Sequence, residues 1–197
     1  MLLNNAPCLS VRRVLYTLKM AFHYRAQLKR YRHEAQYHLR SVLDLDLKRL
    51  KAEGITVLVL DFDGVLASHG EDRVEGDLEP WLDQCLQVFG SNHVFILSNL
   101  PTKTRALYFQ QHFPGIIWVQ VLCKKPYPDG LLAILKETGA PKHAILLIDD
   151  RLLTGILAAV IVGVRALWVV DPLIDIRKRP FQEGLFILLR WFERQLF

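Results

Sequence analysis

The chain has 197 residues, the size of one moderate domain, and 51% of them are hydrophobic. Such a chain can bury a core, which excludes an intrinsically disordered protein. The formal net charge of +5 is unevenly spread: residues 1–33 carry seven Lys or Arg and no acid, whereas residues 34–197 carry 18 basic against 20 acidic residues. The body is slightly acidic, so a generally basic nucleic-acid-binding domain is not the first interpretation.

Residues 9–40 are predicted to form one long basic helix. Apolar side chains recur at roughly helical spacing from Val11 to Phe22, and neither Gly nor Pro interrupts the segment. It is too polar to span a bilayer and lacks the apolar stretch of a secretory signal. A membrane-surface helix, an organelle transit peptide and a solvated helix packed on its own domain all fit this composition.

The rest of the chain alternates between apolar strands and amphipathic helices. Strands are predicted at 56–61, 93–98, 116–122, 144–149 and 166–170, and helices at 44–53, 78–89, 103–112, 129–138, 152–162 and 180–196. This alternation predicts an α/β fold, a three-layer Rossmann-like parallel sheet of about five strands. We therefore divide the chain into a basic N-terminal segment, 1–41, and one α/β domain, 42–197.

Residues 152–170 are apolar except for Thr154 and Arg165, so a membrane-spanning helix has to be considered. Gly163 divides the stretch, and its two halves fall in register with the strand–helix alternation. Elements buried inside a parallel α/β sheet have this composition. We predict a helix followed by a strand here.

Acidic and hydroxyl side chains follow three of the predicted strands. Asp61 ends the first strand and Asp63 comes two residues later, Ser98 ends the second strand and Asn99 follows it, and Asp149 and Asp150 end the fourth strand. Ligands of open α/β sheets bind outside the carboxyl ends of the strands, so these side chains are predicted to converge at one edge. Lys125, after the third strand, can reach the same place. Each residue alone could be a helix cap or a turn residue; together, in strand order, they predict a catalytic edge.

The carboxylates at this edge favour phosphoryl chemistry. They would repel one another without a cation that prefers oxygen ligands, and Mg²⁺ is the usual choice with phosphate substrates. One Asp can attack phosphorus to form an acyl-phosphate, and a second, two residues later, can protonate the leaving oxygen and deprotonate water. Ser98 would hold phosphoryl oxygens, and Lys125 would neutralise charge on Asp61 and on the transferred group.

Four segments together resemble a known family over about residues 42–196. They are DFDGVL (61–66), ILSNL (96–100), KKP (124–126) and LLIDDR (146–151). In order, spacing and strand context they resemble the four motifs of the haloacid-dehalogenase-like phosphatases. The resemblance implies the following roles: nucleophile for Asp61, general acid and base for Asp63, phosphate binding for Ser98 with Asn99, and stabilisation of the phospho-intermediate for Lys125. It also implies that Mg²⁺ is held by Asp61, Asp63 through its backbone carbonyl, and Asp150, with Asp149 as a further candidate ligand.

A narrower resemblance is to the YqeG-type subfamily, carried by SVLDLDLKRLKAEGI and by DDRLLTGILAA, where that group typically reads GDQLLTDVLGG. The subfamily includes mitochondrial and plastid phosphatases that convert phosphatidylglycerophosphate to phosphatidylglycerol, which implies a lipid phosphatase. Three positions depart from the pattern. Val65 replaces the usual Thr, Asp149 replaces the usual Gly, and Gly155 stands where a second acid is common. Gly155 either weakens metal binding or is compensated by Asp149.

The spacing of the motifs leaves no room for a folded cap domain. Only 34 residues separate Asp63 from Ser98, and 26 separate Ser98 from Lys125. An open site suits a substrate whose bulk lies elsewhere: a protein, a nucleic-acid end or a lipid in a bilayer. His69 and Arg73, on the loop 67–77, could touch the substrate, although a solvated loop is the other interpretation.

The leading hypothesis is a Mg²⁺-dependent phosphatase that acts on phosphatidylglycerophosphate. Its partner would be an anionic phospholipid surface, which attracts the N-terminal cations by about 1 kcal/mol per charge; no specific nucleic acid and no protein partner are expected. The apolar face of 180–196 could insert at the headgroups or pack on the sheet. The alternatives are a phosphatase of a phosphoprotein or nucleotide and a catalytically silent binding protein. The expected location is the cytoplasmic membrane face in a bacterium, and a mitochondrion or plastid in a eukaryote.

Overall fold

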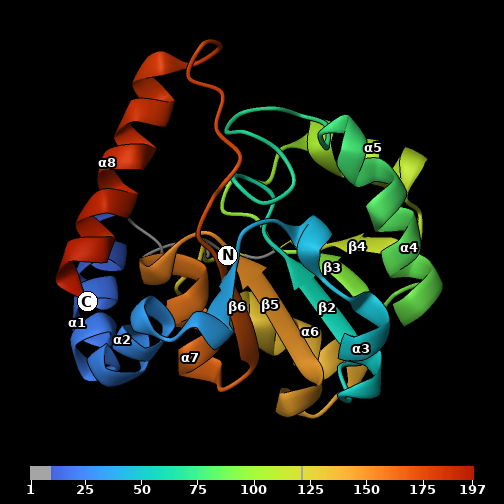
Figure 1. Ribbon diagram of the computed structural model, residues 1–197, viewed down its shortest axis with the longest axis horizontal. Helices are drawn as coiled ribbons and strands as arrows, with labels where there is room; N and C mark the ends of the chain where they lie inside the picture. The colour runs from blue at the N-terminus through green and yellow to red at the C-terminus, as the bar shows by residue number, and fades with distance from the viewer. Residues whose placement is uncertain (1–9, 121) are drawn as a thin grey trace, which may run out of the picture.

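The computed structural model describes residues 10–120 and 122–197. Within them, one parallel sheet of six strands crosses the molecule in the order β1-β6-β5-β2-β3-β4 (Figure 1). The strands are β1 His38–Leu39, β2 Val57–Leu60, β3 Val94–Ile96, β4 Ile116–Trp118, β5 Ile145–Asp149 and β6 Arg165–Val169. The predicted α/β architecture is confirmed, and β1 adds a strand to the five expected.

Helices cover both faces of the sheet and form two hydrophobic cores. One core contains side chains of α3 Leu47–Ala52, α4 Glu79–Phe89 and α5 Lys103–His112; the other contains side chains of α2 Arg25–His33, α6 Asp129–Thr138 and α7 Leu157–Val162. In β2, Leu58 and Leu60 lie in the first core, whereas Val57 and Val59 lie in the second. Successive strand residues point to opposite faces, so a strand covered on both faces is apolar throughout.

The prediction of one helix over 9–40 is wrong. The described part of this segment forms α1 Ser10–His23 and α2, separated at Tyr24, and ends in β1. The break lets α2 bury Leu28 and Tyr31 against the sheet, while β1 satisfies its backbone groups by pairing with β6. The sheet therefore begins before residue 42.

The apolar stretch 152–170 folds as predicted. It forms a short π-helical turn, Leu152–Ile156, followed by α7 and β6. Among the residues that the structure describes, no helix is both long and apolar enough to cross a membrane.

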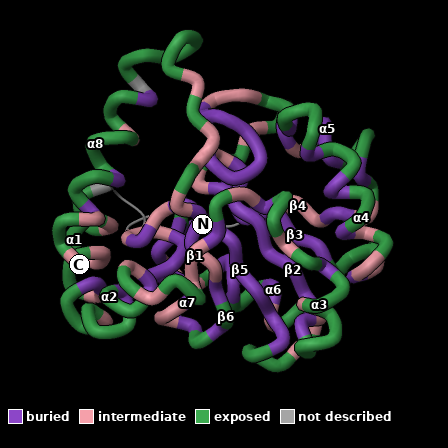
Figure 2. Tube along the Cα trace, viewed as in Figure 1, coloured by how far each residue is buried: buried purple, intermediate pink, exposed green. Residues whose placement is uncertain are grey.

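The last helix, α8 Pro180–Leu196, stands beyond the carboxyl ends of β5 and β6, beside α1 and α2 (Figure 1). This helix buries charged side chains and exposes apolar ones, the reverse of an ordinary amphipathic helix. Its buried residues include the charged Glu183, Arg190 and Glu193, while Phe181 and Trp191 are exposed (Figure 2 shows most of α8 as exposed). The charged face meets the carboxyl edge of the sheet, where Arg190 contacts Asp150, and this leaves the apolar face outside.

Candidate active site

The four motif segments meet at the carboxyl edge of the sheet. A cleft of about 320 Å³ opens there and is lined by Asp61, Asp63, Asn99 and Asp150. A larger groove of about 820 Å³ lies elsewhere, near the start of β6, and is lined by none of the predicted site residues. The smaller cleft is therefore the candidate active site.

Lys125 sits at the centre of the buried carboxylates. Its Nζ lies 3.0 Å from Asp61 Oδ2 and 2.5 Å from Asp149 Oδ2, and its side chain is 2% exposed. The side-chain amide of Asn99 binds both backbone polar groups of Lys125. Asn99 Oδ1 accepts from Lys125 N at 2.7 Å, and Asn99 Nδ2 donates to Lys125 O at 3.3 Å. Asn99, predicted to bind substrate, lines the cleft and positions Lys125.

The buried charges of this cluster perturb one another. Burial raises the pKa of Asp61 well above its usual range, and the carboxylates of Asp149, Asp150 and Asp63 add to the rise, while Lys125 opposes it. Burial lowers the pKa of Lys125, but Asp149 and Asp61 outweigh burial, so the pKa is raised. The site thus holds Lys125 as a cation and concentrates negative charge around Asp61.

Asp63 is bound by Arg105, which lies outside the four motif segments. Arg105 Nη1 donates to Asp63 Oδ2 at 2.9 Å and Nη2 donates to Oδ1 at 2.8 Å. Arg105 is 1% exposed, and its guanidinium lies 4.3 Å from the centre of the Phe62 ring. Ser98 Oγ also approaches Asp63 Oδ2, at 3.4 Å. A signal for Arg105 exists in the sequence: it lies in the first turn of the helix after the second motif, and such turns begin at the carboxyl edge of a parallel sheet.

Asp150 is bound by a second buried arginine. Arg190, on α8, donates through Nε to Asp150 Oδ2 at 2.7 Å, and its Nη2 lies 2.5 Å from the same oxygen. Burial raises the pKa of Asp150, and Arg190 opposes that rise. Gly64 makes this approach possible: its φ is +85°, and a Cβ there would lie 2.7 Å from Asp150 Oδ2. The glycine of the DFDG motif is therefore required by both backbone and space.

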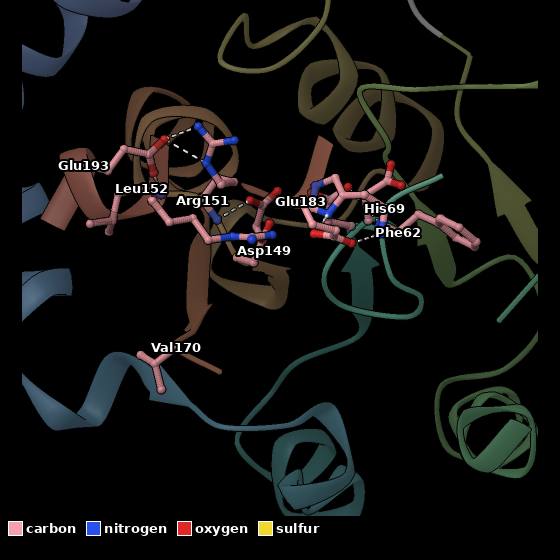
Figure 3. Close-up of polar contacts among 12 residues, drawn as sticks. Phe62, His69, Asp149, Arg151, Leu152, Val170, Glu183 and Glu193 are labelled. Atoms are coloured by element: carbon pink, nitrogen blue, oxygen red, sulfur yellow. Dashed lines mark hydrogen bonds and ion pairs between the residues drawn. The ribbon is translucent and has the colours of Figure 1, made fainter. Parts of the chain in front are cut away.

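Glu193 lies one helical turn after Arg190, on the same face of α8, and fixes the start of the π-helical turn. It pairs with the Arg151 guanidinium and accepts from Leu152 N at 3.0 Å (Figure 3). Arg151 N in turn donates to Asp149 Oδ1 at 2.9 Å. Sequence reasoning missed these α8 residues because they lie some forty positions beyond the fourth motif, although their spacing along one helix face was visible.

A model of the family described as mitochondrial PGP phosphatase matches residues 27–174, well over half of the chain. The chain belongs to this family. The protein is therefore a phosphatase, and its four motifs resemble those of the haloacid-dehalogenase-like phosphatases. A search of curated proteins finds no match.

Two solved structures give weaker likenesses to this phosphatase. A predicted HAD-like family hydrolase from Porphyromonas gingivalis is 13% identical, with a TM-score of 0.46, over 68% of this chain and 98% of its own. An uncharacterized protein from Corynebacterium glutamicum is 19% identical, with a TM-score of 0.43, over 71% of this chain and 96% of its own. Likenesses at this level assign no substrate.

The donor set of the phosphatase fits a hard divalent cation. Carboxylate oxygens of Asp61, Asp149 and Asp150 all lie within 4.8 Å of one another, and all three residues are buried. Mg²⁺ prefers such oxygen ligands. A cation among them would also oppose the mutual repulsion that raises the pKa of Asp61. The side chain of Asp63 lies outside this set, since it is bound by Arg105.

His69, on the loop after Asp61, is buried rather than solvated. Its ring stacks on the ring of Phe186 in α8, with the two ring centres 3.9 Å apart. Its backbone N donates to Oε1 of Glu183 at 3.1 Å, and Figure 3 shows these two residues close together. Burial, assisted by the nearby Arg190, lowers its pKa to about 4. His69 lines the candidate cleft, whereas Arg73 is exposed and is not among the residues that line it.

Proposed function

We propose that the protein is a Mg²⁺-dependent phosphomonoester hydrolase that converts phosphatidylglycerophosphate to phosphatidylglycerol through an aspartyl-phosphate on Asp61. The observation that carries the proposal is the position of Asp61: at a strand end, in the cleft, 3.0 Å from Lys125 and beside two further buried carboxylates. Membership of the PGP phosphatase family supports the choice of substrate.

Asp61 attacks the phosphorus atom, and the bond from phosphorus to the glycerol oxygen breaks. Asp63 protonates that leaving oxygen, then deprotonates the water that hydrolyses the acyl-phosphate, which releases inorganic phosphate and regenerates Asp61. Lys125 neutralises charge on Asp61 and on the transferred group. Held by Asp61, Asp149 and Asp150, Mg²⁺ would supply further positive charge at the transferred phosphoryl group.

To transfer a proton, Asp63 has to turn a carboxylate oxygen toward the leaving group, and Arg105 holds both of its oxygens. Both oxygens accept from the guanidinium in this structure. We infer that Arg105 fixes Asp63 before catalysis and shifts to a single contact when substrate enters, which frees the other oxygen for the leaving group. Ser98 Oγ, 3.4 Å from Asp63 Oδ2, is then placed to bind a phosphoryl oxygen.

The surroundings of the cleft support a lipid in an anionic bilayer as substrate. Arg13 of α1 and Phe186 and Leu189 of α8 line the cleft beside the catalytic residues. Both helices expose apolar side chains: in α1 these are Val11, Val14, Leu15, Leu18 and Phe22, and in α8 they include Phe181, Leu185, Leu188, Trp191 and Phe192. The segment 1–33 contains no acidic residue. We propose that this surface of α1 and α8 rests on anionic headgroups as a peripheral membrane contact.

The expected location follows from the family. The description of the family names mitochondria, which supports our proposal of a mitochondrial membrane surface in a eukaryote. In a bacterium the corresponding place is the cytoplasmic face of the membrane.

The direct test of the function is phosphate release from phosphatidylglycerophosphate in vesicles, with Mg²⁺ and with EDTA. We expect release that needs Mg²⁺ and is lost in Asp61→Asn. Release only from a phosphopeptide or a nucleotide would replace the lipid by a soluble substrate. No release from any of them would favour a catalytically silent binding protein.

The membrane contact has its own test, flotation with anionic and with neutral vesicles. Leu18→Glu in α1 and Leu188→Glu in α8 change side chains that are 52% and 58% exposed, so they place a charge on the surface without disturbing the core. Leu132→Glu, at 49% exposure on α6, is the matched control. We expect binding to anionic vesicles that falls in the first two variants only. Equal loss in the control, or equal binding to neutral vesicles, contradicts this contact.

A further inference from the structure

Three acids line the candidate cleft, and each of them already lies against a cation of the protein. The pairs are Asp61 with Lys125 at 3.0 Å, Asp63 with Arg105 at 2.8 Å and Asp150 with Arg190 at 2.5 Å. Arg151, a further cation of the cleft wall, pairs with Glu193 (Figure 3). The protein therefore neutralises these charges with its own side chains.

Two other cations line the cleft and have no acid beside them. Arg13 of α1 is half-buried, and Lys124, directly before Lys125, is exposed. None of the carboxylates in the described ranges 10–120 and 122–197 forms an ion pair with either side chain. Cations that stay unpaired in a cleft favour an anionic ligand, because the ligand supplies the missing opposite charge.

An aromatic contact fixes the segments that carry these two cations against each other. The ring of Tyr16 stacks on the ring of Tyr127, with the two ring centres 4.4 Å apart. Tyr16 follows Arg13 by three residues and so lies on the same face of α1. Tyr127 N donates to Lys124 O at 3.1 Å, which closes the turn that begins at Lys124. The stack therefore holds the Arg13 face of α1 against the turn that carries Lys124.

We propose that Arg13 and Lys124 form an anion subsite that binds a second, non-reacting phosphate of the substrate. The guanidinium of Arg13 suits two oxygens of one phosphate, and the ammonium of Lys124 adds a point charge. In phosphatidylglycerophosphate, three glycerol carbons separate the reacting phosphomonoester from a phosphodiester, and this phosphodiester is the group that we assign to the subsite. The choice of this lipid rests on the proposed function, whereas the anion subsite does not.

Phosphatidic acid distinguishes the two phosphates, because it carries a phosphomonoester and no phosphodiester. We compare kcat/KM for phosphatidylglycerophosphate and for phosphatidic acid in micelles of a neutral detergent, so that the charge of a bilayer does not contribute. We expect the wild-type protein to prefer phosphatidylglycerophosphate. We expect the ratio of the two values to fall about tenfold in Arg13→Gln and in Lys124→Gln, the factor that a hydrogen bond to a charged group supplies.

Two exposed lysines outside the cleft provide the controls. Lys19→Gln removes the same charge from α1, and Lys103→Gln removes it from the start of α5. We expect both control variants to keep the ratio within about twofold of the wild-type value, since a general loss of charge acts on both lipids alike. A ratio that falls as far in a control as in Arg13→Gln overturns the proposal, and so does an unchanged ratio in both Arg13→Gln and Lys124→Gln.

A binding measurement tests the subsite without turnover. Asp61→Asn is titrated calorimetrically in Mg²⁺ with glycerol 1,3-bisphosphate, whose phosphates are three carbons apart, and with glycerol 1-phosphate, which has one phosphate. We expect the bisphosphate to bind about tenfold more tightly or better, and we expect most of that preference to disappear when Arg13→Gln or Lys124→Gln is added, but not when Lys19→Gln is added. Absence of a preference for the bisphosphate overturns the subsite. A preference in a protein that hydrolyses neither lipid would defeat the proposed function and support the subsite.

Discussion

Replacing Arg105 by alanine removes the guanidinium that donates to both Asp63 oxygens. Arg105 is 1% exposed, and besides its two bonds to Asp63 it donates to Glu71 O at 2.9 Å and to Leu100 O at 3.0 Å. Loss of one member of a buried ion pair leaves the other charge uncompensated and costs about 3–5 kcal/mol. For a chain of this size, that loss lowers the unfolding temperature by roughly 6–20 °C.

The assay is thermal unfolding of Arg105→Ala and Arg105→Lys, together with phosphate release. Lysine keeps the charge but cannot reproduce the two parallel bonds, so we expect an intermediate unfolding temperature and a loss of activity in both variants. The matched control is Arg30→Ala, which breaks an exposed pair with Glu34 and costs about 1 kcal/mol or less. If Arg105→Ala unfolds within the range of Arg30→Ala, Asp63 does not depend on this arginine and the reasoning fails.

Three further predictions concern the loop and helix that enclose the cleft. The pKa of His69 is about 4 in the folded protein and near 6.5 in the unfolded chain. Its neutral form therefore contributes roughly 3 kcal/mol to the free energy of unfolding above pH 6.5, and this contribution is lost as the pH falls toward 4. We expect His69→Gln to flatten the curve of stability against pH in this range, and an unchanged slope would count against the prediction. Glu193→Gln loses charge-assisted bonds to the π-helical turn, and urea titration should report a cost of about 2–3 kcal/mol; no measurable change would mean that α8 does not brace this turn. Gly64→Ala places a Cβ 2.7 Å from Asp150 Oδ2 at a positive φ, so we expect phosphatase activity to fall by about tenfold or more, and full activity would contradict the packing described.

The parts of the site that lie at strand ends were predictable from the sequence. Asp61 and Asp149 directly follow or end apolar runs, and the carboxyl ends of parallel strands share one edge. The contact of Lys125 with Asp61 was expected for the same reason, whereas its contact with Asp149 was not predicted. The position of a residue at the end of a strand can be predicted from the local sequence, because the strand itself fixes where that residue lies.

The helix-borne parts were not predictable in the same way. Arg105 and Arg190 reach Asp63 and Asp150 from helices whose orientation depends on packing, and neither belongs to a motif. The apolar pattern of 180–196 predicts a helix but does not say which face is buried, and here the buried face includes the charged residues. The break at Tyr24 likewise depends on the burial of Leu28 and Tyr31 against the sheet, a tertiary contact that local spacing does not encode.

The measurement that tests the central claim most directly is acid quenching of the protein during turnover of phosphatidylglycerophosphate in Mg²⁺, followed by peptide mapping for a phosphoryl group. We predict that the phosphoryl group is found on Asp61 and is absent in Asp61→Asn, which also releases no phosphate. Release of phosphate at the wild-type rate by Asp61→Asn, or a phosphoryl group on a residue other than Asp61, would contradict the account.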